Sequence, residues 1–380
     1  MERVEGEHSR VEKKKIGILT FWGVPNYGAF AQAYALNKVI SSMVPDSVVV
    51  DLAYLHPKHK ALYFRKKSPQ MTSLKQLITP SFYKQWISYL TNTKVEYPQF
   101  AIDWNSIPHV DLKNKTQLER YNCDIIVTGS DAIWEYSIPD FGDDVHLIGN
   151  RLNCTKLIAY AASFGDMNES DSFADFIPQG LNNYEMIAVR DQTSQNIIRK
   201  LMDGKTIDIV LDPSLLHDFK NDKEIPKTRY SNYILVYGND FQDSLINDVR
   251  TYARANKLTL IGAGIAPGWC DICLREIGPK EWIGLFRDAR MVVTCTFHGL
   301  MFSINFEKMV VFNQVDYVKN RSTYLLEQLG LSQLYNKDGE SVLKKVLDFQ
   351  WNYDEINANL DKMRENSMDY LRRGLRDEEH

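Results

Sequence analysis

The sequence has few cysteines and no long apolar run. Five cysteines are scattered among 380 residues, and an odd number spread along a long chain does not fit a disulfide framework. No stretch approaches the ~20 apolar residues that a membrane-spanning helix needs. The opening letters, MERVEGEHSRVEKKK, have no apolar core, so we expect a short disordered lead over 1–15 rather than a secretory signal. These absences predict a soluble, cytoplasmic protein.

The sequence also lacks a dominant charge and any metal-binding pattern. It carries 45 basic and 49 acidic residues, a balance that does not favour nucleic acid as a partner. Cys270 and Cys273 form a lone CxxC pair with no second pair nearby, so we interpret them as two partly buried thiols. No His or carboxylate cluster has ligand spacing, so we expect no required metal and no cofactor.

One segment, 52–95, contains no Asp or Glu. We expect a helical insertion here, and two interpretations stay open. It is either a pair of solvated helices, or a basic face that meets an anionic partner such as a membrane surface or a lipid-linked phosphate. The second would place the protein at the inner face of the membrane. Basic and aromatic side chains are interleaved along the segment: Lys58, Lys60, Arg65, Lys66, Lys67, Lys75, Lys84, Lys94, Tyr63, Phe64, Phe82, Tyr83, Trp86 and Tyr89.

Short apolar runs alternate with helical patterns along most of the chain. IGILTF, SVVVDLAY and CDIIVTGS are typical of buried parallel strands, and the length suggests two domains. We predict an α/β fold with an N-terminal domain over 16–220 and a C-terminal domain over 228–345. A polar stretch from Asp218 to Ser231 would link them. A C-terminal helix over 346–380 is expected to lean back over the first domain. Two such domains imply a cleft between them, where small ligands usually bind.

Polar residues follow several of these strands, and ligands of open parallel sheets bind at the carboxyl ends of strands. Asn26, Tyr27 and Gly28 occupy the first strand-to-helix turn. Glycine lets backbone N–H groups approach a ligand, and the helix N-terminus favours an anion. The alternative is a tight turn without a ligand.

Three further strand ends carry residues that could bind a sugar or an anion. Asp131, beside Ser130, either caps a helix or accepts a hydrogen bond from a sugar hydroxyl, with Trp134 as a stacking platform. Ser163 follows the next strand and is placed with them. Arg190 either pairs with a neighbour such as Asp191, or binds a phosphate or carboxylate through two parallel hydrogen bonds.

The run VTCTFHGLMFS ends a strand and begins a helix. Its histidine, His298, can exchange a proton near neutral pH. Gly299 and the flanking hydroxyl groups suggest the close approach of another group. We therefore interpret this turn as part of a site rather than as a core histidine.

Six motifs appear in the order and spacing of the polysaccharide pyruvyl transferase family, which the chain resembles over roughly 16–331. They are GILTFWGVPNYGAFAQAYAL, DIIVTGSDAIW, YAASFG, AVRDQTS, VLDPSLL and TCTFHGLMFSINFEKMVVF. The resemblance implies two Rossmann-like domains with a central cleft, in a GT-B-like arrangement. It implies phosphoenolpyruvate as the donor and a sugar of a surface polysaccharide, or of its lipid-linked precursor, as the acceptor. The product would be a pyruvate ketal bridging two sugar hydroxyls.

The resemblance also implies roles for single residues. His298 matches the family's proposed catalytic acid or base. Apart from the resemblance, we hypothesise that Asp131 orients or deprotonates the acceptor hydroxyl. Arg190 matches a donor-binding arginine. Many members carry an arginine two residues before the histidine, where this chain has Thr296; Arg321 matches a recurrent arginine of the branch that shares this loss. The donor site would thus comprise Arg190, Arg321, Asn26, Tyr27, Gly28 and Gly299.

Three alternatives remain open at the level of sequence. A nucleotide-sugar-dependent glycosyltransferase would use the same two-domain cleft. A non-catalytic sugar- or phosphate-binding protein would bind the ligand without releasing phosphate. A scaffold at the membrane would act through 52–95 and would not need His298.

Overall fold

The structure is a computed structural model, and it describes residues 13–65, 81, 84, 87, 94–139, 144–335 and 341–376. Residues 1–12, most of the expected lead, lie outside this range. So does much of the basic segment, including Lys66, Lys67, Lys75, Phe82, Tyr83, Trp86 and Tyr89. Within the described residues, no helix combines the length and the apolar character needed to cross a membrane.

The N-terminal half of the chain forms a seven-stranded parallel sheet. Its strand order is β3-β2-β1-β4-β5-β6-β7, which extends the 3-2-1-4-5-6 order of the Rossmann fold by one strand. The strands read as apolar runs because helices cover both faces of such a sheet. Their bounds are β1 Lys15–Leu19, β2 Val48–Ala53, β3 His109–Asp111, β4 Asn122–Thr128, β5 Asn153–Ala162, β6 Met186–Val189 and β7 Ile207–Ile209.

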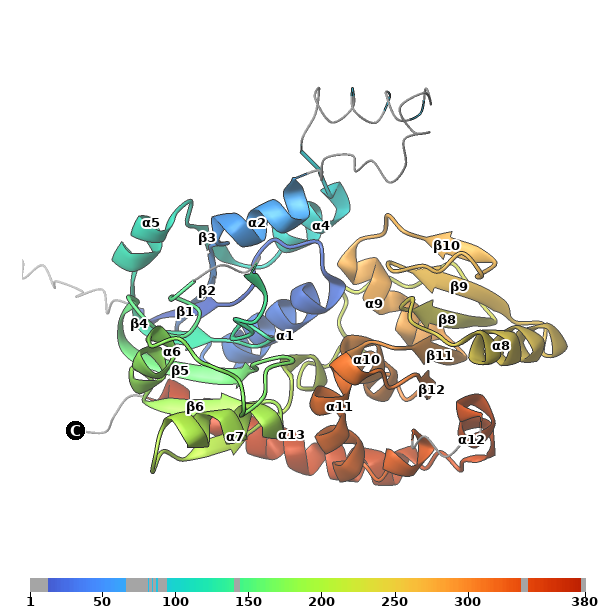
Figure 1. Ribbon diagram of the computed structural model, residues 1–380. Helices are drawn as coiled ribbons and strands as arrows, with labels where there is room; N and C mark the ends of the chain where they lie inside the picture. Colours follow the sequence, from blue (N-terminus) through green and yellow to red (C-terminus); the bar gives the residue numbers. More distant parts are fainter. Residues whose placement is uncertain are drawn as a thin grey trace, which may run out of the picture.

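A five-stranded parallel sheet follows, in the order β10-β9-β8-β11-β12. In both sheets the first strand is central and later strands are added outward on each side, as in the Rossmann fold. The prediction of two Rossmann-like α/β domains is confirmed. The two sheets lie at opposite ends of the molecule (Figure 1). The strands are β8 Tyr233–Tyr237, β9 Thr259–Ala263, β10 Ile272–Leu274, β11 Met291–Thr294 and β12 Met309–Phe312.

Helices connect the strands of both sheets. In the first domain they are α1 Tyr27–Met43, α2 Pro57–Phe64, α4 Pro98–Trp104, α5 Lys115–Arg120, α6 Phe176–Asn182 and α7 Gln192–Leu201. In the second part of the chain they are α8 Asp243–Ala255, α9 Pro279–Asp288, α10 Phe297–Asn305, α11 Asp316–Gln328, α12 Val342–Asp348 and α13 Tyr353–Leu375. The described residues also form two short 3₁₀ turns, η3 Pro213–Leu215 and η4 Ser332–Leu334.

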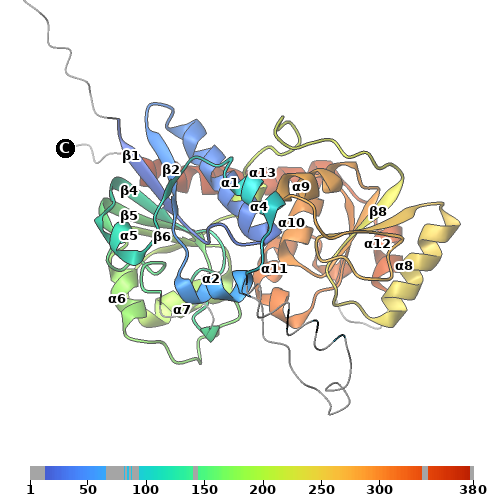
Figure 2. The same cartoon turned by 90° about the horizontal axis from the view of Figure 1, so that it is seen from above.

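An aromatic core joins the domains where α1, α9 and α10 meet near the centre of the molecule (Figures 1 and 2). Tyr27 of α1 stacks on Trp282 of α9 at 5.2 Å between ring centroids, and Trp282 meets Phe302 of α10 edge-on at the same distance. Trp282 and Phe302 are fully buried. One continuous apolar cluster therefore holds both sheets, and it fixes the strand ends of one domain relative to those of the other.

The long helix α13 runs along the base of both domains (Figure 1). Near its start, the Tyr353 hydroxyl donates to the Lys308 carbonyl of the second domain at 2.6 Å. Near its end, the Tyr370 hydroxyl donates to the Ala159 carbonyl of the first domain at 2.8 Å. The helix thus returns the chain to the first domain, and the two domains are tied together on a second side.

Candidate active site

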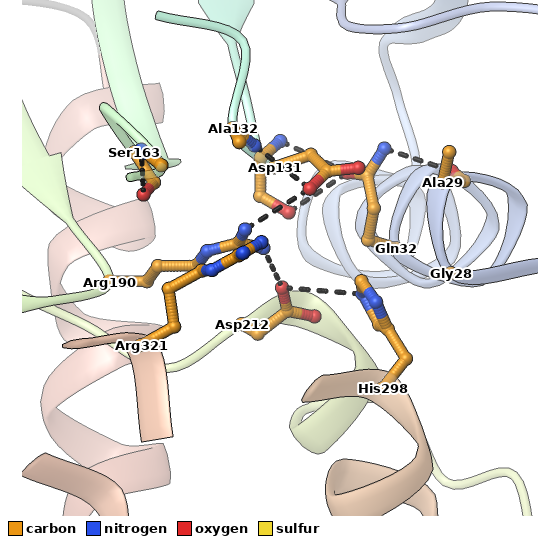
Figure 3. A network of polar contacts seen from close by, with 12 residues as sticks. Gly28, Ala29, Gln32, Asp131, Ala132, Ser163, Arg190, Asp212, His298 and Arg321 are labelled. Atoms are coloured by element: carbon orange, nitrogen blue, oxygen red, sulfur yellow. Dashed lines mark hydrogen bonds and ion pairs between the residues drawn. The ribbon is translucent and has the colours of Figure 1, made fainter. Parts of the chain in front are cut away.

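Two strand ends, one from each domain, face each other across the domain junction. Asp131 lies three residues after β4, and His298 is the second residue of α10, which follows β11. Asp131 adopts a φ of +84°, a conformation uncommon for a residue with a side chain and often found at functional sites. This turn places the Asp131 carboxylate beside Arg190 of the β6 end (Figure 3).

Arg190 is the centre of a buried ion-pair network. Its Nη1 donates to Asp212 Oδ2 at 2.8 Å, and its Nη2 donates to Asp131 Oδ1 at 3.1 Å. The side chain is only 1 % exposed, and its guanidinium group lies 4.8 Å from the ring centroid of Phe297. A buried arginine with this arrangement is held in one orientation. Asp191, the neighbour considered from the sequence, instead caps α7 by accepting from the Ser194 N–H at 2.7 Å.

The paired charges alter the pKa values of both partners. Burial alone would raise the pKa of Asp131, but the positive charge of Arg190, with help from His298, outweighs it and holds that pKa below its usual range. Burial works against the charge of Arg190, yet Asp131 and Asp212 raise the pKa of its guanidinium group. Asp131 is therefore ionised at neutral pH and is a weak proton acceptor.

Asp212 is a site residue that the sequence analysis did not single out. Its Oδ2 accepts from Arg190 and lies 3.8 Å from His298 Nε2. Its Oδ1 accepts from the Ser214 N–H at 3.0 Å and from the Ser214 hydroxyl at 2.7 Å. A sequence signal for Asp212 was nevertheless present. An Asp-Pro pair directly follows an apolar run in VLDPSLL, and the other site residues also follow apolar runs.

His298 points toward the same carboxylates from the second domain (Figure 3). Its Nε2 is buried and has no hydrogen-bond partner among the described residues, since the Asp212 oxygen is too distant to accept a normal hydrogen bond. Burial lowers the pKa of His298 below its ordinary value; Arg190 and Arg321 add to this effect, while Asp212 and Asp131 oppose it. The imidazole is thus neutral near pH 7, with Nε2 available to a ligand.

Arg321 reaches the site from α11. Its Nη2 donates to Asp166 Oδ1 at 3.2 Å and also to the Tyr317 carbonyl. It lies close enough to influence the pKa values of both Asp131 and His298. Its Nε is buried without a hydrogen-bond partner in the described structure, and the same holds for the Nε of Arg190.

Three buried nitrogen atoms of this network have no hydrogen-bond partner among the described residues: Nε of Arg190, Nε of Arg321 and Nε2 of His298. Buried polar nitrogens are normally satisfied, because an unmade hydrogen bond costs roughly 1–3 kcal/mol. Nitrogen atoms of two arginines and a histidine suit phosphate or carboxylate oxygens. The arrangement predicts a small anionic ligand that completes the network.

The first strand-to-helix turn is close to this site, and its residues make contacts within the chain. Asn26 Oδ1 caps α1 by accepting from the N–H groups of Gly28 and Ala29 at 2.9 and 3.2 Å, so those donors are already used. Tyr27 is buried in the domain junction, and its hydroxyl donates to the Ile277 carbonyl at 3.1 Å. The structure thus gives Asn26 a capping role and Tyr27 a packing role, and their donor-binding roles stay predictions. Gly28 instead touches His298.

Gly299 is also explained by contacts within the chain. A Cβ atom at this position would lie 2.1 Å from Thr294 Oγ1 and 2.7 Å from Thr296 Oγ1. Its N–H donates to Thr296 Oγ1 at 3.0 Å, which makes Thr296 the N-cap of α10. Two threonine hydroxyls therefore approach Gly299 closely, and its donor-binding role stays a prediction.

The three residues predicted to bind the acceptor are buried in this structure, and their acceptor-binding role stays a prediction. Trp134 is fully buried, and its indole N–H donates to the Leu147 carbonyl at 2.8 Å, so neither ring face is open to a sugar. Ser163 is fully buried; its hydroxyl accepts from the Gly165 N–H and its N–H donates to the Asp131 carbonyl. Ser130 is equally buried and bonds to Gln32.

Gln32 of α1 is a second residue that sequence reasoning missed. Its Oε1 accepts from both the N–H and the hydroxyl of Ser130, at 3.1 and 2.9 Å, and its Nε2 donates to Thr20 Oγ1 at 3.0 Å. A fully buried glutamine with every bond satisfied fixes the turn that carries Asp131. Among the residues described, no group of three or more His, Cys, Asp or Glu side chains is placed to hold a metal ion.

A family model for polysaccharide pyruvyl transferase matches residues 26–312, a range that includes Asp131, Arg190 and His298 but not Arg321. No curated protein sequence matches the chain.

Solved structures match at low identity. A putative UDP-N-acetylglucosamine 2-epimerase from Listeria monocytogenes aligns with a TM-score of 0.46 and 9% identity, over 95% of this chain and 91% of that chain. The E. coli heptosyltransferase WaaC with ADP aligns with a TM-score of 0.37 and 9% identity, over 80% of this chain and 89% of that chain. Identities this low say nothing about which substrate this chain uses.

Proposed function

The chain belongs to the polysaccharide pyruvyl transferase family, and from this premise we propose that it transfers a pyruvyl group from phosphoenolpyruvate to a sugar. The acceptor would belong to a surface polysaccharide or its lipid-linked precursor, and the product would be a pyruvate ketal. The observation that supports this donor is that Arg190, Arg321 and His298 each keep a buried nitrogen without a hydrogen-bond partner in the described structure, and that both arginines lie close enough to His298 to add to the effect of burial in lowering its pKa. Phosphoenolpyruvate carries the carboxylate and phosphate oxygens that such nitrogens bind.

The reaction needs a proton on the donor's terminal methylene. Protonation converts the methylene to a methyl group and makes the adjacent carbon electrophilic. One sugar hydroxyl attacks that carbon, the C–O bond to phosphate breaks, and a neighbouring hydroxyl closes the ketal. Of the two protons that the hydroxyls lose, one balances the proton added to the methylene and the other leaves with inorganic phosphate.

His298 is the group proposed to deliver that proton from Nε2. The free imidazole is neutral near pH 7 because its pKa is lowered by burial and by the two arginines. A bound anion offsets the arginine charges and raises the pKa of the imidazole, so the donor itself brings the acid into its charged form. General acid–base help of this kind is worth about 10²–10⁴-fold.

Asp131 suits an orienting role better than that of a base. Its Oδ1 already accepts from the Ala132 N–H at 2.8 Å and from Arg190 at 3.1 Å, and its pKa is held low. Its contribution would be to fix Arg190 and to accept a hydrogen bond from the acceptor hydroxyl. We further propose that no resident metal or cofactor takes part, which full activity in excess chelator would test.

Thermal-shift titration with phosphoenolpyruvate beside a panel of nucleotide sugars tests the donor. A ligand that binds only the folded chain at 100 times its dissociation constant stabilises it by about 2.7 kcal/mol. We expect a shift with phosphoenolpyruvate and a smaller one in Arg190→Lys. A shift with a nucleotide sugar alone would favour a glycosyltransferase, and a shift without phosphate release in the presence of acceptor glycans would favour a binding protein.

A further inference from the structure

A cavity of about 770 Å³ opens in the first domain, beside the loop that precedes α1. The loop joins β1 to α1. Trp22 and Gly23 of this loop line the cavity, while Gly28, at the start of α1, touches His298. The carbonyl of Val24, between them, accepts from the indole N–H of Trp104 at 2.9 Å, which holds the loop against α4. The loop that lines the cavity therefore leads directly into the helix turn that contacts His298.

The cavity lies where an open parallel sheet usually binds ligands. Ala53 ends β2, Asp111 ends β3, and both line it. The carboxyl ends of two adjacent strands, β2 and β3, thus contribute to its lining, together with residues of α2 and α4, two helices that lie next to each other in Figure 1. This is the edge at which ligands of such sheets are found, and the volume is within the roughly 300–1,000 Å³ typical of small-molecule sites.

The lining combines aromatic rings with polar groups of balanced charge. Trp22, Phe64 and Tyr97 line the cavity and are each partly exposed. Two lysines, Lys60 and Lys113, are matched by two carboxylates, Glu96 and Asp111. Aromatic faces bind the C–H faces of a pyranose ring, while mixed donors and acceptors bind its hydroxyls. A free nucleoside diphosphate would instead need a net positive lining.

We propose that this cavity binds a sugar unit of the acceptor glycan. The inference rests on the proposed function, because it assigns the acceptor half of the same reaction. It replaces the buried residues Ser130, Trp134 and Ser163 with a surface that a sugar can reach. The cavity presents the glycan beside the β1–α1 loop, and the sugar that receives the pyruvyl group extends past that loop to His298.

A second hollow of about 620 Å³ continues from the first, since the two share Pro57, Lys60, Phe64 and Glu96. It adds Arg65 and Lys94 to its walls, so its charge is more positive than that of the cavity. A glycan that carries an anionic group on the side away from the reacting sugar would place that group here.

Saturation-transfer NMR on the full chain tests the proposal with the methyl pyranosides of glucose, galactose, mannose and N-acetylglucosamine, with and without phosphoenolpyruvate. We expect one pyranoside to bind the wild type and to bind Phe64→Ala about tenfold more weakly, because the ring loses a buried apolar contact. Phe349→Ala is the matched control, since Phe349 is a partly buried aromatic packed in the second domain's core. If Phe64→Ala does not fold, Asn105→Ala removes an exposed polar lining residue instead.

The outcomes separate this inference from the proposed function. Absence of binding by every pyranoside, or equal binding to folded Phe64→Ala and wild type, would overturn the acceptor subsite even if phosphoenolpyruvate still raises the melting temperature. Pyranoside binding that depends on Phe64, in a chain that phosphoenolpyruvate does not stabilise, would support the subsite and overturn the donor. Tighter binding of the sugar 1-phosphate than of its methyl glycoside, reduced in Arg65→Ala, would support an anionic substituent in the second hollow.

Discussion

The imidazole of His298 packs directly against Gly28, a residue of the other domain. A Cβ atom built on Gly28 would lie 2.1 Å from His298 Nδ1 and 2.6 Å from its Cγ, far inside van der Waals contact. Gly28 lies in the first turn of α1, and no positive φ requires glycine there. The close approach of His298 therefore explains why residue 28 is a glycine. Gly28 in turn fixes the position of the imidazole ring across the domain junction.

Gly28→Ala should displace His298 while leaving the helix intact. Alanine favours a helix over glycine by up to about 1 kcal/mol, but the added methyl group must push the ring away. We expect turnover with phosphoenolpyruvate to fall about 10²-fold, as a misplacement near 1 Å can cause, with a melting temperature that stays within a few degrees of the wild type.

Gly268→Ala is the matched control, because a Cβ atom there meets no heavy atom within 4 Å and its φ is not positive. It should keep full turnover. Full turnover in Gly28→Ala as well would show that the ring position does not matter for the reaction.

Arg190→Ala should destabilise the fold strongly. It leaves Asp131 and Asp212 buried without their shared cation, and breaking a buried pair costs about 3–5 kcal/mol. Urea unfolding measures the loss. Arg373→Ala is the control, since this arginine is 52% exposed and pairs with Asp369 on the surface; such pairs are worth about 0–1 kcal/mol.

The loss in Arg190→Ala should also depend on pH. In the wild type the folded pKa of Asp131 is lowered, so its contribution is present above the unfolded pKa and is lost as pH falls through the folded pKa. Without Arg190, burial raises the pKa of Asp131, so that ionisation of Asp131 then destabilises the folded chain as pH rises instead of stabilising it. We expect the difference in unfolding free energy between variant and wild type to be larger at pH 8 than at pH 5. Equal differences at both pH values would contradict the assignment.

Sequence patterns predicted the sheets well, because apolar runs ending in small or polar residues are a local signal for buried parallel strands. They also placed His298, Arg190 and Asp131 at strand ends that meet. The ion-pair partners of Arg190 could not be predicted from the sequence, because they are carboxylates 59 and 22 residues away along the chain. The sequence offered only a neighbour such as Asp191 as a partner. The solvent exposure of single side chains could not be predicted either. Tryptophan is a residue type that stacks on sugars, but Trp134 is fully buried.

Arg321→Ala should weaken donor binding more than it weakens the fold. The side chain is 16% exposed and its ion pair with Asp166 is at the surface, so we expect less than about 1 kcal/mol of lost stability. Loss of a charge-assisted contact to the donor, worth about 1.5–3 kcal/mol, would raise the KM for phosphoenolpyruvate about tenfold or more. Lys319→Ala, an exposed cation on the same helix, should leave KM unchanged; an unchanged KM in Arg321→Ala would remove Arg321 from the donor site.

Thr296→Arg tests whether Arg321 replaces the arginine that many family members carry at this position. In an Arg321→Ala background, the new arginine should restore part of the donor affinity. It also removes the N-cap of α10, so we expect a loss of about 0.5–2 kcal/mol in stability. The readout is KM for phosphoenolpyruvate beside the melting temperature. No recovery of KM in a folded double variant would show that the two positions are not equivalent.

Donor binding should be coupled to uptake of a proton by His298. The pKa of the free imidazole is lowered, so at pH 7 the ring is neutral, and the anionic donor raises that pKa by opposing the arginine charges. Calorimetric titration in two buffers of different ionisation enthalpy measures the protons exchanged. Because the phosphate of the donor also titrates near pH 6, His298→Gln is required as the reference: it should take up fewer protons than the wild type at pH 7. The difference should vanish well below the folded pKa of His298, where the ring is charged before the donor arrives. Identical proton exchange in wild type and His298→Gln at every pH would mean that His298 stays neutral in the complex, and the acid for the methylene would have to be another group.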